Sequence, residues 1–178
     1  MGDVHNRFDE MELYPEHTIL QVGDLCIRPE VDYPTWSDNF HFISGNHDKR
    51  ALCKDHPNYL GDYGYKPEWD MFYISGAKSY DIPGHDIEEL SRKEKRAAIE
   101  MCADIKPRIL LTHEGPYSPV AQFFGYGACI SSMKTFMQDL FDIYQPELWV
   151  FGHHHASRRM TIGKTEFVCL DKLELYEP

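Results

Sequence analysis

The chain has 178 residues, and its formal net charge at pH 7 is −11. This length predicts a single domain spanning residues 1–178, with a core that needs no disulfide bonds. The acidic charge argues against a broad basic face for binding nucleic acid, and no segment approaches the roughly 20 consecutive apolar residues that a membrane span needs.

In the first half of the chain the sequence predicts three strands and one long irregular segment. Residues 17–24 and 40–48 are short apolar runs that end in Asp, which is typical of buried strands. Residues 54–70 are rich in Gly, Pro and aromatic side chains, so they form either a binding loop or a loop packed down by its own aromatic rings. A further strand is predicted over 73–82, around Gly76.

The middle of the chain predicts a helix, a strand and a second irregular segment. The helix covers 91–105 and begins with Ser91, and Glu94 lies at the spacing of a capping box. Residues 107–115 have the apolar character of a buried strand that ends in polar side chains. Residues 115–128 resemble the earlier loop in composition, and the same two alternatives apply.

The last third predicts a helix, a buried strand and a closing hairpin. The helix covers 131–146, the strand covers 147–155, and the hairpin covers 159–170 with its turn at Gly163 and Lys164. Strands that alternate with helices predict a layered α/β fold. The helix carries an apolar stripe, predicted to be core, made of Met133, Phe136, Met137, Leu140, Phe141 and Tyr144.

Polar residues that follow the strands are candidates for one shared site, because ligands of layered α/β folds bind beyond the carboxyl ends of the strands. Two carboxylates, one amide oxygen and four imidazoles suit two five- or six-coordinate divalent ions that share a bridging carboxylate. The seven candidate ligands are Asp3, His5, Asp24, Asn46, His113, His153 and His155, and His47 is a further polar candidate at the same strand end as Asn46.

The three consecutive histidines at 153–155 are predicted to divide into two ligands and one bystander. Side chains alternate sides along an extended backbone, so His153 and His155 can face the site while His154 faces away and has a structural role. We expect structural roles for the remaining histidines, and His85 is the one to reconsider first. These histidines are His17, His41, His56 and His85.

The ordered motifs Asp-x-His, Gly-Asp, Gly-Asn-His-Asp, His and Gly-His-x-His, from residue 3 to residue 155, resemble the signature of the calcineurin-like metallophosphoesterases. The resemblance implies a sandwich of two mixed β-sheets flanked by helices, with two metal ions at the strand ends. It also implies that Asp24 bridges the ions. The first ion would be bound by Asp3, His5, Asp24 and His155, and the second by Asp24, Asn46, His113 and His153.

The resemblance further implies attack on phosphorus by a hydroxide that bridges the two ions, with His47 as the residue that binds phosphate or protonates the leaving group. Asp48 either orients His47 or only closes the loop. Arg28 matches an arginine of the related serine/threonine phosphatases, although Ile27 replaces an aspartate of that motif. Arg28 is therefore a candidate phosphate ligand, together with Asn46, or a surface or helix-capping residue.

The chain departs from the family at its beginning, because only Met1 and Gly2 precede Asp3 and the usual first strand is missing. Either the start is internal to a longer chain, or neighbouring strands close the gap. The missing strand could also leave an unpaired sheet edge that invites contact with a second copy.

Three other classes of function compete with the phosphoesterase prediction. A non-catalytic scaffold similar to the retromer subunit of this fold would have lost ligand positions, and none is lost here. If the protein bound a single metal ion or had a redox function, Asp24 as a bridge and the ligands of the second ion would have no role. A nuclease is poorly supported by the net charge.

The expected cofactors are two divalent ions, Mn first and Fe, Zn or Ni as alternatives. The expected partner is a small phosphate ester, either a monoester or a diester, and neither nucleic acid nor a membrane. No positively charged, apolar leader opens the chain, and the cysteines form no Cys-x-x-Cys pair, which favours thiols in a reducing cytoplasm. The cysteines are Cys26, Cys53, Cys102, Cys129 and Cys169.

Overall fold

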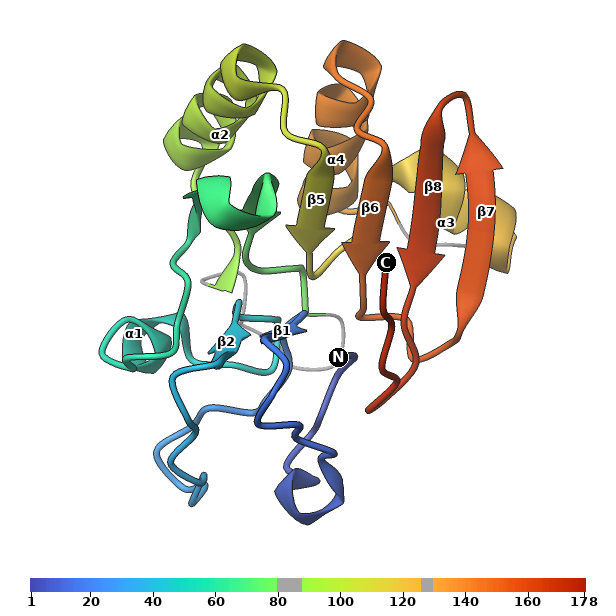
Figure 1. Cartoon of the computed structure of the whole chain (residues 1–178). Coiled ribbons are helices and arrows are strands. Elements are labelled where there is room, and N and C mark those ends of the chain that lie inside the picture. Colours follow the sequence, from blue (N-terminus) through green and yellow to red (C-terminus); the bar gives the residue numbers. More distant parts are fainter. Residues whose placement is uncertain (80–87, 126–129) are drawn as a thin grey trace.

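Two β-sheets of unequal size form the inner layers of the computed structural model, which describes residues 1–79, 88–125 and 130–178. The smaller sheet pairs β1 (Ile19–Gln21) with β2 (Phe40–Phe42) in parallel. The larger sheet is mixed, with parallel inner strands and an antiparallel strand at each edge (Figure 1). Its order is β3 (Tyr63–Lys66), β4 (Met71–Ile74), β5 (Ile109–Thr112), β6 (Leu148–Phe151), β8 (Thr165–Cys169) and β7 (Arg158–Ile162).

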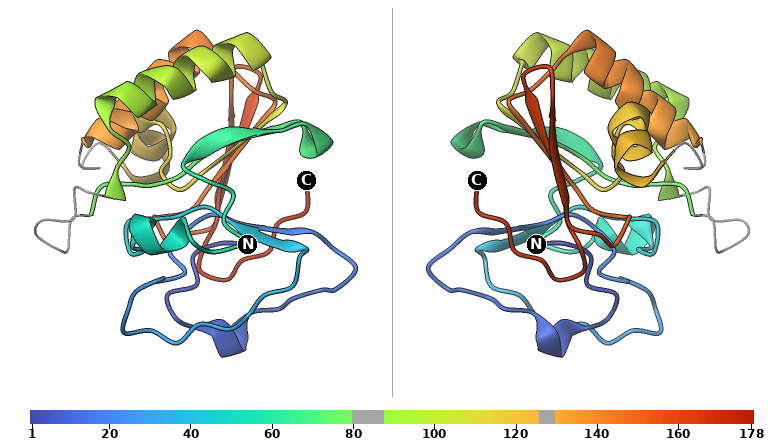
Figure 2. Two further views of the ribbon diagram at one scale, coloured as in Figure 1. Left: turned by 90° about the vertical axis from the view of Figure 1, so that its left-hand side faces the viewer. Right: turned by 90° about the vertical axis from the view of Figure 1, so that its right-hand side faces the viewer.

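The two faces of the larger sheet are covered by different layers. Helices α2 (Arg92–Ile105), α3 (Tyr117–Phe124) and α4 (Ser132–Ile143) pack on one face, and the small sheet lies against the other, as the side views in Figure 2 show. All four residues of β5 and of β6 are buried, which explains why these strands read as continuous apolar runs. The predicted α/β sandwich of two sheets with flanking helices is therefore confirmed.

The long helices follow the signals in the sequence. At the start of α2 the Ser91 hydroxyl accepts a hydrogen bond from the Glu94 amide, and the Ser91 amide donates to the Glu94 carboxylate. This is the predicted capping box, which satisfies amides that the first helical turn leaves unpaired. In α4 the predicted apolar stripe from Met133 to Phe141 is buried against the larger sheet. Both helix predictions are confirmed.

The predicted hairpin is also confirmed. Strands β7 and β8 pair in antiparallel register, from Arg158 opposite Cys169 to Ile162 opposite Thr165. Gly163 in the turn has a φ of 62°, a conformation that glycine adopts without steric cost.

Both segments predicted to be irregular contain regular structure. Residues 54–70 include β3 and the short helix η2 (Pro67–Trp69), and residues 115–128 include α3. Strand β4 ends at Ile74, so the strand predicted over 73–82 is shorter and begins earlier than expected. His85, Cys129 and residues 80–82 lie outside the described residues.

Among the described residues no strand precedes β1. Met1 nevertheless lies beside β1, since its amino group donates to the Leu20 carbonyl (2.8 Å) and its carbonyl accepts from the Val22 amide (3.1 Å). A groove of about 940 Å³ opens next to this edge, between the two sheets, and Leu20 and Ile109 are among its apolar lining residues.

Two short helices complete the described elements, η1 (Phe8–Glu10) and α1 (Arg50–Cys53). In the part of the chain that the structure describes, no helix is both long and apolar enough to cross a membrane.

Candidate metal centre

The candidate ligands lie beyond the carboxyl ends of strands from both sheets. Asp24 follows β1, Asn46 and His47 follow β2, His113 directly follows β5, and His153 lies two residues beyond β6. Parallel strands end at the same edge of a sheet, so these loops meet where the small sheet packs against the large one. The structure therefore brings the polar strand ends together, as the sequence predicts.

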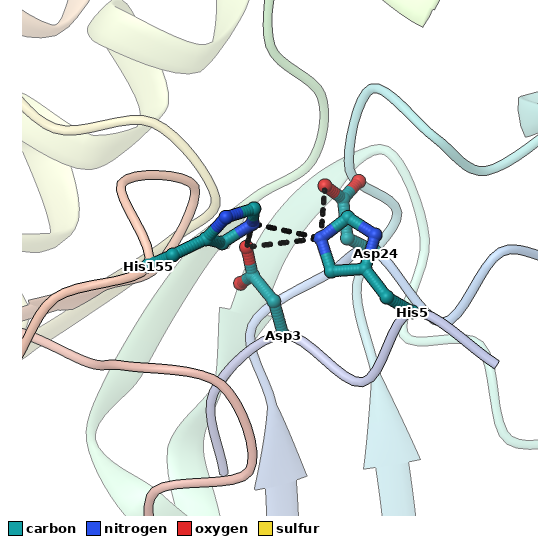
Figure 3. A group of neighbouring side chains, drawn as sticks. All are labelled: Asp3, His5, Asp24 and His155. Carbon is teal, nitrogen blue, oxygen red and sulfur yellow. Dashed lines mark hydrogen bonds and ion pairs between the residues drawn. The ribbon is translucent and has the colours of Figure 1, made fainter. Parts of the chain in front are cut away.

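The first group of ligands contains Asp3, His5, Asp24 and His155, whose ligand atoms all lie within 4.8 Å of one another (Figure 3). His155 Nε2 lies 3.1 Å from Asp3 Oδ2 and 2.7 Å from His5 Nε2. His5 Nε2 is 3.6 Å from Asp24 Oδ2. Two imidazole nitrogens and two carboxylates thus face a common point, which is the arrangement that a divalent ion requires.

The second group contains Asp24, His113 and His153, again with ligand atoms within 4.8 Å of one another. His113 Nε2 lies 3.4 Å from Asp24 Oδ1 and 3.1 Å from Asn46 Oδ1, so the amide oxygen joins this group. Asp24 belongs to both groups. Its Oδ2 faces His5, and its Oδ1 faces His113.

The tautomer of His113 suits a metal ligand. Its Nδ1 lies 2.7 Å from the Val22 carbonyl, which can only accept, so Nδ1 carries a proton and donates it. Nε2 is thereby directed at Asp24 and Asn46. A backbone carbonyl that fixes the other ring nitrogen is the usual outer partner of a metal-bound histidine.

The electrostatics of the site favour a bound cation. Burial would lower the pKa of His113, but the Asp24 and Asp3 carboxylates outweigh it and raise this pKa to about 10. Asp24 Oδ2 is buried and accepts no hydrogen bond within the described structure, although a buried carboxylate oxygen needs a positively charged or donating partner. Burial lowers the pKa of His5 and of His153 to about 4, so both rings are neutral near pH 7 and keep a lone pair for a metal.

The backbone at the three histidines differs from the expected extended strand. His153 and His155 have φ values of 67° and 48°, in the left-handed region. Both lie in the groups of side chains that could hold a metal ion, but the extended backbone that we expected from strand alternation is wrong. A tight loop with left-handed residues turns them inward, and such residues cost of order 1–2 kcal/mol each unless other contacts fix them.

His154 is outside both ligand groups and contacts Glu114, a residue that sequence reasoning missed. Its Nε2 lies 3.0 Å from Glu114 Oε1, and its ring stacks on Phe124 at 4.9 Å between centroids. Glu114 is fully buried, and its Oε2 also lies 3.5 Å from His153 Nε2 and 3.7 Å from Lys134 Nζ. The one available signal was an acidic residue directly after His113 in a strand end otherwise made of ligands.

His47 lies beside the first group, close to Asp24, and its ring contacts both His5 and Arg28. His47 Nε2 is 4.0 Å from Asp24 Oδ2, and the His47 ring packs edge-on against the His5 ring. Arg28 Nε donates to the His47 carbonyl (2.8 Å), and Arg28 Nη2 lies 3.1 Å from His47 Nδ1. The predicted phosphate ligand Arg28 thus holds the backbone and the ring of His47.

Asp48 holds three loop segments together through its two carboxylate oxygens. Its Oδ2 accepts from the amides of Asp24 and Gly45, and its Oδ1 accepts from the amide of Ile27, all at 2.8 Å. Burial and the neighbouring Asp24 carboxylate raise the pKa of Asp48 to about 6. Of the two predicted roles, these bonds favour loop closure over orienting His47.

The described histidines that were expected to be structural lie in ordinary surroundings. His56 Nδ1 accepts from the Asn58 amide, and its ring contacts Trp36. His41 packs against the Trp69 ring, and His17 packs against a neighbouring tyrosine.

Comparison with known proteins connects this geometry to a family. The family model described as calcineurin-like phosphoesterase matches residues 1–157. The fold is similar to that of a phosphopantetheinyl hydrolase from Mycobacterium tuberculosis, with a TM-score of 0.51 and 14% sequence identity over 97% of this chain and 88% of that one. No curated protein sequence matches significantly.

Proposed function

Because this chain belongs to the calcineurin-like phosphoesterase family, we propose that it hydrolyses phosphate esters with two divalent ions held at the site described above. The observation that carries the proposal is the position of Asp24, whose two carboxylate oxygens face two different groups of ligands. A carboxylate has free lone pairs on both oxygens and can therefore bridge two cations.

The donor set supports two sites for borderline divalent ions. When bound, such ions would lower the pKa of a shared water molecule and neutralise the phosphate oxygens. Carboxylate and imidazole ligands accept several metals, so we propose Mn²⁺, with Fe, Zn or Ni as alternatives. The first site would use Asp3, His5, Asp24 and His155, and the second would use Asp24, Asn46, His113 and His153.

The protein supplies fixed geometry around these sites. Asp3 Oδ1 and Oδ2 both accept from the His153 amide, which ties the start of the chain to the loop after β6. The Val22 carbonyl fixes the ring of His113. Rigid ligands held by such outer contacts bind metal more tightly than ligands that must first be ordered.

His47 is the proposed contact to the substrate. Its side chain is 21% exposed, whereas Asp24 beside it is buried, so the ring lies between the ligands and solvent. Its Nε2 is the nitrogen that faces Asp24. This atom would meet an ester oxygen either by transferring its proton or by donating a hydrogen bond.

The proposed substrate is a small phosphate ester. The phosphopantetheinyl hydrolase shares 14% sequence identity with this chain, so the similarity concerns the fold and does not identify the substrate. The net charge of −11 disfavours nucleic acid. We propose the cytoplasm as the location, because the described cysteines Cys26, Cys53, Cys102 and Cys169 are buried thiols.

The test is hydrolysis of a chromogenic phosphomonoester and of its matching diester with added Mn²⁺. Asp24→Asn should abolish the metal-dependent turnover and reduce the number of bound Mn²⁺ ions measured by calorimetry. Asp38→Asn is the matched control, since it makes the same chemical change at an exposed position. If neither ester is hydrolysed with Mn, Fe, Zn or Ni, the enzyme proposal is overturned and a scaffold of the same fold takes its place.

A further inference from the structure

Asp48 is a buried residue that joins the ends of both strands of the small sheet. It is 1% exposed. Its Oδ2 accepts from the amides of Asp24 and Gly45, and its Oδ1 accepts from the amide of Ile27, all at 2.8 Å. Asp24 and Ile27 follow β1, and Gly45 follows β2. Buried backbone amides need an acceptor, and one carboxylate supplies it here for three of them.

The turn that Asp48 holds has an unusual backbone. Asp24 and Cys26 have φ values of 60° and 68°, in the left-handed region. Residues other than glycine keep this conformation only where surrounding contacts fix it. The two oxygens of Asp48 bind the amides of Asp24 and Ile27, which lie at the two ends of this turn. Asp48 therefore opposes relaxation of the turn that carries the proposed bridging carboxylate.

Hydrogen bonds join the loops of Asp24 and Asp48 in both directions. Asp48 Oδ2 accepts from the Asp24 amide, and Asp24 Oδ1 accepts from the His47 amide, again at 2.8 Å. The second bond orients the Asp24 carboxylate. Its Oδ1 lies on the side of His113, 3.4 Å from Nε2, and its Oδ2 lies on the side of His5, 3.6 Å from Nε2 (Figure 3). A shift of one loop against the other would therefore displace both oxygens.

Asp24 passes this constraint on to the first segment of the chain. The Asp24 carbonyl accepts from the amides of Val4 (3.1 Å) and His5 (2.9 Å). The segment that contains Asp3 and His5 is thus bonded to the residue whose amide Asp48 holds. Movement of Asp24 would displace the shared ligand and two further ligands of the first group.

We propose that Asp48 is a positioning residue for both metal ions, because it holds Asp24 in the left-handed conformation from which its two oxygens face the two ligand groups. This inference rests on the proposed phosphoesterase function. It differs from both roles expected from the sequence. A residue that only closes a loop affects stability alone, and a residue that orients His47 affects catalysis with the metal sites filled.

The first experiment is calorimetric titration of the variants with Mn²⁺. Asp48→Ala removes both oxygens and should weaken the binding of both ions about 10- to 100-fold, the usual effect of losing an outer partner of metal ligands. Asp48→Asn keeps one oxygen for the amides of Asp24 and Gly45 but places an NH₂ donor against the Ile27 amide. Its loss should lie between wild type and Asp48→Ala, and this variant of equal size carries the test if Asp48→Ala does not fold.

Asn58→Ala is the matched control for a buried side chain that joins loops. Asn58 is 6% exposed, and its Nδ2 donates to the carbonyls of Ser37 (2.8 Å) and Phe40 (2.7 Å). These bonds lie at the start of β2, whereas Gly45 follows its end. Asn58→Ala should lower the urea midpoint and leave Mn²⁺ affinity within about twofold of wild type. If both alanine variants lose Mn²⁺ affinity in proportion to their loss of stability, Asp48 has only a structural role and the inference is overturned.

The second experiment separates an effect through Asp24 from an effect through His47. With an aryl phosphate as substrate, the Mn²⁺ concentration that gives half the maximal rate should rise in Asp48→Asn by the same factor as the calorimetric Kd. An unchanged Mn²⁺ affinity together with a lower kcat at saturating Mn²⁺ would show that Asp48 acts through His47, and the inference would be overturned.

The third experiment uses amide hydrogen exchange in the metal-free protein, so it does not depend on turnover. The amides of Asp24 and Ile27 should exchange at least about tenfold faster in Asp48→Asn than in wild type, while the amide of Leu140 inside α4 keeps its rate. An unchanged rate at Asp24 overturns the inference.

These outcomes separate the two proposals. A wild-type protein that binds two Mn²⁺ ions, with Asp48→Ala binding them as tightly, keeps the phosphoesterase function and removes the inference. A wild-type protein that binds no divalent ion removes the function, and the exchange of the Asp24 amide then decides by itself whether Asp48 holds Asp24.

Discussion

Substitution of Gly45 by alanine tests whether the metal centre depends on the close approach of the loops after β1 and β2. A Cβ at Gly45 would overlap Asp24 Oδ1 and would lie 2.6 Å from the Asp24 amide nitrogen and 2.7 Å from His113 Cε1. The amide cannot rotate away, so the loop itself must move. Overpacking of this kind costs about 1–3 kcal/mol of unfolding free energy. Because Asp24 and His113 are both displaced, we expect Mn²⁺ affinity to fall about 10- to 100-fold.

Two measurements on the same variant separate stability from metal binding. Urea unfolding without metal gives the change in free energy, and calorimetric titration with Mn²⁺ gives the affinity. Gly163→Ala is the control, because its added Cβ meets only the flexible end of Gln145, far from the site in the β7–β8 turn, although its positive φ also carries a cost. If Gly45→Ala binds Mn²⁺ as tightly as the wild type, the proposed packing of Asp24 and His113 is refuted.

Three further predictions concern stability. Burial would raise the pKa of Asp62, but hydrogen bonds from neighbouring cations outweigh burial and lower this pKa to about 2. The ionised Asp62 therefore contributes about 2 kcal/mol to the free energy of unfolding above pH 4, and this contribution is lost as the pH falls toward 2. Asp62→Asn should flatten that acid loss in urea unfolding at several pH values; an unchanged slope would contradict the assignment. Ser91→Ala removes the cap of α2 and should cost about 1 kcal/mol, seen as a melting temperature lower by about 2–4 °C. Trp149→Phe removes the buried 2.9 Å hydrogen bond to Thr112 and should cost about 1–3 kcal/mol in urea unfolding, and an unchanged midpoint would count against this bond.

Sequence patterns predict the elements of this fold whose signals are local. The capping box at Ser91 marks the start of α2, and continuous apolar runs mark β5 and β6, because strands covered on both faces have no polar side. Strand β3 and helix α3 lie in segments whose Gly, Pro and aromatic content is typical of loops. Their structure depends on neighbours distant in the sequence, as in the pairing of β3 with β4 and the packing of α3 against α4, and no local pattern reports such contacts.

The candidate site also has a part that the sequence predicts and a part that depends on tertiary contacts. The residue types at the strand ends predict which side chains meet, because strands order those positions. The roles of Arg28, Asp48 and Glu114 are set by hydrogen bonds between loops, and single positions in the sequence do not encode these partners. The left-handed backbone at His153 is likewise imposed by tertiary contacts, among them the bond from its amide to Asp3.

The first group of ligands joins parts of the chain that are far apart in sequence. His5 and His155 are separated by 150 positions, and so are Asp3 and His153. Contacts between residues so far apart in sequence require the closure of a long loop, which costs conformational entropy. We therefore expect these contacts to form late in folding. The complete ligand set therefore exists only after the chain has folded, and an ion bound there would act as a reversible cross-link that resists the detachment of the first five residues. Metal occupancy would then be visible as slower amide hydrogen exchange at both ends of this loop.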